Sequence, residues 1–263
     1  MSKMRQTDPF DQIADDVLNS IFDQNFVGKL GEFYTGVDLK LAGLLGARGR
    51  TLKNLYLPKD DGGTSEIDLV YITQCGIFVI ESKNYSGWIF GDEKSSYWTS
   101  MLPNKQKNRF YNPILQNMTH MRWLSKYLGD DEKAVPMFSL IVFSERCELK
   151  KISYEKDHLL VIKRDDLIAA IRNTMKVRPA VMTEEEVEKI FRQLSPLTHA
   201  DAETKASHIE EIKKKETICP WCGSELVLRT ARKGQSAGNQ FWGCSGYPKC
   251  RYTRPLKTDE AAQ

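Results

Sequence analysis

Two short motifs, Glu66-Ile67-Asp68 and Glu81-Ser82-Lys83, carry the carboxylates and the amine best suited to joint chemistry. Both motifs lie in expected β-strands: Glu66–Thr73 alternates, and Ile77–Lys83 begins apolar and ends polar. Only Gln74-Cys75-Gly76 separates the two strands, which predicts a hairpin. Side chains of like parity share one face of a strand. We therefore expect Asp68, Glu81 and Lys83 to project from the same face.

The turn of this hairpin decides which polar groups lie opposite each other. With Gln74-Cys75 as the turn, Asp68 lies opposite Glu81, with Cβ atoms about 5 Å apart. With Cys75-Gly76 as the turn, Asp68 lies opposite Lys83 and diagonal to Glu81. The sequence leaves both registers open.

Two neighbouring carboxylates repel each other, so the pair needs a compensating partner. A bound Mg²⁺ or Mn²⁺ would provide one, because hard cations take carboxylate oxygens. Lys83 would then orient or activate a water and stabilise charge on a phosphoryl group. The plainer alternative is a strand that emerges into solvent, with Glu81 and Lys83 simply exposed.

The cysteines indicate a second chemical centre. Of six cysteines, four form two close pairs near the end of the chain: Cys219, Cys222, Cys244 and Cys250. This spacing predicts a tetrahedral Zn²⁺ site in a reducing compartment rather than a disulfide framework. Four protein ligands leave no open position, so the zinc would be structural. A module of about 40 residues has too little core to fold without it.

Composition places the chain among ordinary globular proteins. Its 263 residues are 41% hydrophobic and 28% charged, which excludes full-length disorder and a collagen-like chain. The net charge is +3, and residues 217–263 hold seven Lys or Arg against three Asp or Glu. This basic end hints at a polyanionic partner. With no apolar run suited to a membrane helix or signal, we expect a cytoplasmic protein, and a nucleoid-associated one is compatible.

The elements that must position these residues follow from hydrophobic periodicity. Asn112-Pro113 opens a helix, because Asn is a good N-cap and Pro suits the first turn. The remaining pattern interleaves strands with helices, which predicts an α/β domain. Residues 84–111 combine aromatic side chains with a basic, polar loop. The expected helices are 28–45, 113–128, 165–175 and 184–194, and the expected strands are 51–57, 66–73, 77–83, 138–143 and 159–162.

Changes in composition divide the chain into five segments. We expect an N-terminal helical extension at 1–27, an α/β domain at 28–195, a polar linker at 196–216, a zinc ribbon at 217–256 and a tail at 257–263.

Several motifs follow one another along the first half of the chain: Gly31-Glu32, Ser65-Glu66-Ile67-Asp68, the run GIFVIESKNYSG at 76–87, Trp98, Asn112-Pro113 and Gln116-Asn117. This region, roughly 28–128, resembles the nuclease-related domain (NERD) family, which is assigned to the PD-(D/E)xK nuclease superfamily. The resemblance implies a restriction-endonuclease-like mixed sheet flanked by helices and a metal-dependent phosphodiester hydrolase.

The resemblance also implies roles for individual residues. Asp68 matches the superfamily's aspartate, with Ile67 in place of the usual proline, and Glu81 and Lys83 match its (D/E)xK pair. Glu32 matches the acidic residue of the first helix, and Gln116 matches the polar residue of the helix after the core strands. Superfamily members can keep the fold and lose catalysis, so activity does not follow from the match alone.

The cysteine-rich segment resembles the four-cysteine zinc ribbon at the C-terminus of bacterial DNA topoisomerases, through CPWCGSELVLRTARKG and FWGCSGYPKCRYTRP. This resemblance implies DNA binding, often to single strands. Cations could contact phosphates, and aromatic rings could stack on bases. The candidate DNA-binding residues are Arg229, Arg232, Lys233, Phe241, Trp242, Tyr247, Lys249 and Arg251, with at least one of Phe241 and Trp242 expected in the ribbon's own core.

Together these features predict a Mg²⁺- or Mn²⁺-dependent deoxyribonuclease, endo or exo, that a zinc ribbon tethers to DNA. Asp68 and Glu81 would hold the metal, Lys83 would act on the water or the developing charge, and Glu32 and Gln116 would support them. DNA is the expected partner, single-stranded DNA and a protein partner are compatible, and no membrane is expected. The competing hypothesis is a non-catalytic DNA-binding adaptor built on a nuclease-like scaffold.

Overall fold

The computed structural model describes residues 49–129, 135–201, 204–210, 217–219, 222–232 and 237–255. The helix expected at 28–45, with Glu32, lies outside these ranges, as does Lys233. The chain divides into two compact units, Met1–Ala200 and Asp201–Gln263, with the division inside the expected linker. Each unit is described separately.

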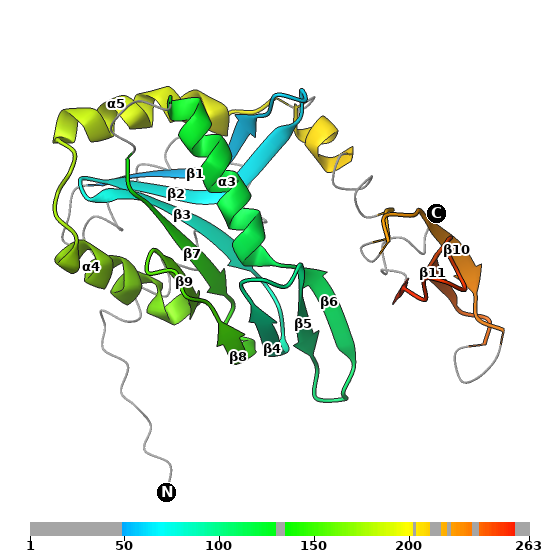
Figure 1. Ribbon diagram of the computed structural model, residues 1–263. Helices are drawn as coiled ribbons and strands as arrows, with labels where there is room; N and C mark the ends of the chain where they lie inside the picture. The colour runs from blue at the N-terminus through cyan, green and yellow to red at the C-terminus, as the bar shows by residue number, and fades with distance from the viewer. Residues whose placement is uncertain are drawn as a thin grey trace, which may run out of the picture. The chain divides into compact units, whose positions relative to one another are not determined.

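A mixed five-stranded sheet forms the centre of the first unit (Figure 1), in the order β1-β2-β3-β7-β9. Its first three strands, β1 (Gly49–Pro58), β2 (Thr64–Thr73) and β3 (Gly76–Lys83), pair antiparallel. The other two, β7 (Met137–Phe143) and β9 (Leu159–Lys163), continue from β3 in parallel. The expected α/β class with a mixed sheet is confirmed.

Helices cover both faces of this sheet. One apolar layer joins it to α3 (Pro113–Leu128) and α5 (Glu184–Leu194), and a second joins the opposite face to α4 (Leu167–Val177). Because β3 is buried on both faces, its apolar residues run without interruption from Ile77 to Ile80. The polar end of β3 therefore belongs to a strand whose other residues are almost all buried in the core.

A second sheet has the order β6-β5-β4-β8. Its strands are β4 (Gly87–Asp92), β5 (Tyr97–Met101), β6 (Lys107–Tyr111) and β8 (Cys147–Ser153). The sequence suggested aromatic residues and a loop over 84–111 and no strand at 147–153, so all four strands were missed. The inner faces of these strands pack around Trp98, whose ring stacks on Phe143. A side chain at position 91 would collide with the Trp98 indole, which explains the glycine there.

Asn112 links the second sheet to α3. Its side chain accepts a hydrogen bond from the Ile114 backbone, which confirms the predicted N-cap. The same side chain donates to the carbonyls of Asp92 and Ser95. The start of α3 is thereby fixed, and the helix presents its first turns to the end of β3. Elsewhere α4 begins after a short 3-10 turn, Arg164–Asp166, and α5 has the predicted bounds.

The second unit contains β10 (Leu226–Thr230), β11 (Gln240–Cys244) and β12 (Thr253–Pro255) in one antiparallel sheet. β10 and β11 form a hairpin, and β12 adds a third strand to it. Among the residues described in either unit, no helix is long and apolar enough to cross a membrane.

Candidate active site and zinc ribbon

The site begins where β2 and β3 part. Pairing runs from Thr73↔Gly76 to Leu69↔Ile80, so the turn is Gln74-Cys75. Of the two registers that the sequence allowed, the one that aligns Asp68 with Glu81 is correct. Beyond Leu69 and Ile80, β2 and β3 no longer pair with each other. β2 stays paired with β1 and β3 with β7, and we call this separation of the two strands the fork.

Asp68 lies at the point of this fork. Its Oδ2 accepts a hydrogen bond of 2.7 Å from the backbone N–H of Ser82 on β3. A carboxylate thus replaces the carbonyl that a continuous ladder would supply to that donor. The separation of the strands leaves room for a carboxyl group between them and points it toward Glu81.

Glu81 and Lys83 form a compact polar group with α3. Glu81 is only 2% exposed, and its Oε1 lies 2.7 Å from the Lys83 ammonium. Lys83 also donates to the Gln116 side chain, at 3.0 Å. The structure therefore brings together Asp68, Glu81, Lys83 and Gln116, four of the five predicted residues. The alternative in which Glu81 faces solvent is wrong.

His120 is a residue of this group that the sequence analysis missed. Its Nε2 lies 3.3 Å from Glu81 Oε2, and its Nδ1 shares a 2.7 Å hydrogen bond with Ser65 Oγ. Within the described residues, Glu81 Oε2 and His120 Nε2 are buried and neither makes a well-formed hydrogen bond. His120 follows Gln116 by four residues, so their shared helix face was the signal that could have revealed it.

The four cysteines of the second unit converge as predicted. All four Sγ atoms lie within 4.8 Å of one another. The Cys219–Cys250 pair is 3.6 Å apart and the Cys222–Cys244 pair is 3.3 Å apart. A tetrahedral zinc with Zn–S bonds of 2.3 Å separates its sulfurs by about 3.8 Å, so these distances fit a zinc ion.

Comparison with known proteins identifies the first unit. The family model described as "Nuclease-related domain" matches residues 27–144. An uncharacterized protein of Bacillus anthracis is 30% identical over 164 residues, which are 62% of this chain and 74% of that protein. The chain belongs to the nuclease-related domain family. No solved structure matches.

The second unit matches the family model "Topoisomerase DNA binding C4 zinc finger" at residues 216–259. DNA topoisomerase 1 of Methanocaldococcus jannaschii is 48% identical over 50 residues, 19% of this chain and 6% of that enzyme. The uncharacterized protein YrdD of Escherichia coli is 52% identical over 40 residues, 15% of this chain and 19% of YrdD. This nuclease-related domain protein therefore carries a topoisomerase-type zinc ribbon, and it spans only a small part of the topoisomerase.

The ribbon presents four of its eight candidate DNA-binding residues at the surface. Arg232, Lys249, Arg251 and Tyr247 are exposed, and the Arg229 guanidinium lies over the Tyr247 ring. Phe241 and Trp242 are half-buried, with Trp242 packed against the cysteine core, so the expected inward aromatic is present only in part. Lys233 lies outside the described residues.

Burial and neighbouring charges shift the pKa values of the ionisable groups in the nuclease-related site. Burial, followed by the nearby charge of Glu81, raises the pKa of Asp68 to about 7. Burial acts to raise the pKa of Glu81, but Lys83 and His120 together outweigh it and the pKa falls below its usual range. Burial opposes the charge on Lys83, yet Glu81 keeps its pKa raised. Two carboxylates face one ammonium, so the site has an excess of negative charge when all three are ionised.

Asp68 gives this nuclease-related domain a testable pH dependence. With a folded pKa of about 7 against 3.8, the metal-free native state holds a proton that the unfolded state releases. The stability from this carboxyl is full below pH 4 and is lost as pH rises toward 7 and beyond. Asp68→Asn should therefore be more stable than the parent at pH 8, by up to roughly 4 kcal/mol, with little difference at pH 4.

Urea unfolding of the first unit at both pH values measures the effect, with zinc retained and no other divalent metal added. Glu155→Gln, on the loop between β8 and β9, is the control, because that carboxylate is exposed. An Asp68→Asn variant less stable than the parent at pH 8 would contradict the assignment.

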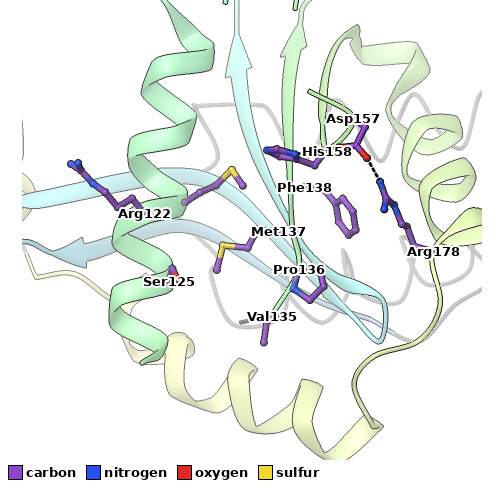
Figure 2. A pocket seen from close by; sticks show the side chains of 10 residues that line it. Arg122, Ser125, Val135, Pro136, Met137, Phe138, Asp157, His158 and Arg178 are labelled. Atoms are coloured by element: carbon purple, nitrogen blue, oxygen red, sulfur yellow. Dashed lines mark hydrogen bonds and ion pairs between the residues drawn. The ribbon is translucent and has the colours of Figure 1, made fainter. Parts of the chain in front are cut away.

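The pocket in Figure 2 is separate from these carboxylates. It has a volume of about 500 Å³ and is lined by residues of α3, β7 and the segments around Asp157 and Arg178. Asp157 is engaged by the Arg178 guanidinium at 2.9 Å, and the walls are largely apolar. None of the five predicted site residues lines it.

Proposed function

We propose that the protein is a metal-dependent DNA nuclease of the PD-(D/E)xK type, tethered to DNA by its zinc ribbon. The observation that carries this proposal is the fork between β2 and β3. It places Asp68, Glu81 and Lys83 together, with Glu81 almost fully buried. Burying the Glu81 carboxylate and partly burying that of Asp68 costs free energy unless a cation compensates them.

The residues at the fork fit Mg²⁺ or Mn²⁺. Asp68 and Glu81 supply the carboxylate oxygens that these ions prefer, and burial, followed by the charge of Glu81, raises the pKa of Asp68, which a bound cation would offset. When bound, the ion supplies Lewis-acid activation of water and of a phosphoryl oxygen. Glu32 would add an acidic group from the N-terminal segment. Its position is outside the described residues.

The remaining chemistry falls to the chain's own side chains. The Lys83 ammonium, held between Glu81 and Gln116, is placed to orient the attacking water or to stabilise charge on the phosphate. Its raised pKa keeps it protonated and suits it to electrostatic stabilisation rather than to a base. Gln116 would fix the direction of the ammonium.

The second unit would supply affinity for DNA. Four thiolates would hold a structural zinc, and the exposed cations and Tyr247 would bind DNA, including single strands. Tethering raises the local concentration of DNA at the nuclease site. We place this activity in the cytoplasm or at the nucleoid.

The test is cleavage of labelled single- and double-stranded DNA by the zinc-loaded protein with Mg²⁺ or Mn²⁺. Ca²⁺ serves as the control, because it takes the same oxygen ligands in a looser geometry. Metal-dependent cleavage is expected. DNA binding without cleavage on any substrate would instead support the adaptor.

His120 is expected to position Glu81. His120→Ala removes the imidazole between Ser65 and the buried carboxylate, so Glu81 loses orientation and Mn²⁺ affinity should fall about 10- to 100-fold. Mn²⁺ binding followed by electron paramagnetic resonance measures this loss without reference to activity. His120→Asn, which keeps a polar group, should recover part of the affinity. Unchanged binding in His120→Ala would overturn the role.

A further inference from the structure

The second sheet has an outward face that the nuclease site does not use. Side chains alternate along each strand, so those opposite to the Trp98 side point away from the core. Pairing aligns them in three rows across the sheet. The rows are Glu148, Trp88, Met101 and Lys107; Lys151, Phe90, Thr99 and Arg109; and Tyr97 with Tyr111. We call this the outer face of the second sheet.

Aromatic side chains are unusually exposed on the outer face. Trp88 is 44% exposed and Tyr111 is 47% exposed. Among the described residues of the first unit, these are the two aromatic side chains that are most open to solvent, and both lie on this face. Each sits on a rigid paired strand rather than in a loop. Exposed aromatic groups on a sheet can serve as stacking platforms for bases.

Cations accompany the aromatic rings. The Lys150 ammonium lies 5.5 Å from the Trp88 ring, and the Arg109 guanidinium lies 5.4 Å from the Tyr97 ring. Lys107 and Lys151 add two exposed positive charges. The carboxylates nearby are engaged locally: Glu148 pairs with Lys150, and Asp92 accepts hydrogen bonds from the turn at Ser95. The face thus combines stacking surfaces with positive charge.

The face also lies close to the nuclease site along the chain. β3 ends at Lys83 and β4 begins at Gly87, so Trp88 is five residues beyond the lysine. Five residues span at most about 18 Å. Figure 1 shows β4, β5 and β6 grouped beside the start of α3, the helix that carries Gln116.

We propose that the outer face of the second sheet binds single-stranded DNA, as a surface of the nuclease-related domain additional to the zinc ribbon. Bases would stack on Trp88 and Tyr111, and Lys107, Arg109 and Lys151 would contact phosphates. A single strand fits better than a duplex because only unpaired bases offer their ring faces. The proposal rests on the DNA-binding part of the proposed function and not on cleavage.

The experiment measures binding of a fluorescent oligothymidylate and of a matched duplex by anisotropy. It uses the zinc-loaded full chain without added Mg²⁺ or Mn²⁺, so its result does not depend on nuclease activity. Trp88→Ala and Tyr111→Ala should each weaken single-strand binding about fivefold or more, and duplex binding less. Val181→Ala, an exposed apolar change away from this face, should leave binding unchanged.

Salt dependence gives a second, independent measurement. Lys107→Ala should lower the slope of log affinity against log salt by about 0.7, the value for one phosphate contact on a single strand. Lys189→Ala, an exposed lysine on α5, is the matched control. Parent-like single-strand affinity in both aromatic variants, with the fold retained by circular dichroism, would overturn the proposal. So would an equal loss on duplex, or a changed oligomeric state with unchanged DNA affinity.

Discussion

Glu81→Gln should reduce metal-dependent DNA cleavage by at least about 10³-fold while leaving the fold and the ribbon's DNA binding intact. Glutamine keeps the volume of the buried side chain and can still accept from Lys83, but it removes the charge that a divalent cation requires. Metal activation contributes several kcal/mol to a hydrolytic transition state, and every 1.36 kcal/mol is a factor of ten in rate. Single-turnover cleavage and Mn²⁺ titration measure the two consequences separately.

Lys83→Met distinguishes metal binding from catalysis at the same site. Methionine replaces the ammonium with an apolar group, so the carboxylates keep their affinity for the cation while the charge beside the phosphate is lost. We expect Mn²⁺ binding at or above the parent level together with loss of cleavage. Glu185→Gln serves as the control for a carboxylate on the surface. Parent-like cleavage in either site variant would exclude the proposed active site.

Removal of zinc should unfold the ribbon and leave the nuclease-related domain folded. Among the described residues of the second unit, the buried core is Leu226 with Cys219, Cys244 and Cys250, and Trp242 and Tyr252 pack against it only in part. Without the metal, the bonds that join the four cysteines are lost. The small apolar core of a module of this size does not keep it folded. The first unit has its own apolar layers on both faces of the sheet and needs no zinc.

Cys244→Ser tests this expectation without a chelator. Zinc content should fall from one ion per chain, the amide resonances of the ribbon should collapse, and DNA affinity should drop by at least tenfold. The unfolding transition of the first unit should keep its midpoint, because the two units are separately compact. Cys75→Ser, a change at a buried thiol of the first unit, should leave the zinc content at one. Full DNA affinity in Cys244→Ser would contradict the ribbon's role.

The sequence predicted the residues of both centres because the signals for them are local. The parity of side chains along two strands and a short turn between them predicted Asp68, Glu81 and Lys83 on one face. The paired spacing of the cysteines predicted the ribbon. The helix start at Asn112 was readable for the same reason, since capping depends on neighbours in the chain.

Only the tertiary structure decided the hairpin register, the fork and the burial of Glu81. The register depended on which of two turns formed, and the fork arises because β1 and β7 hold the strands from outside. His120 and Ser65 meet through the packing of α3 on β2, and the second sheet pairs β4 with the distant β8. Such contacts join residues that are far apart in the chain, so no local hydrophobic pattern in the sequence predicts them.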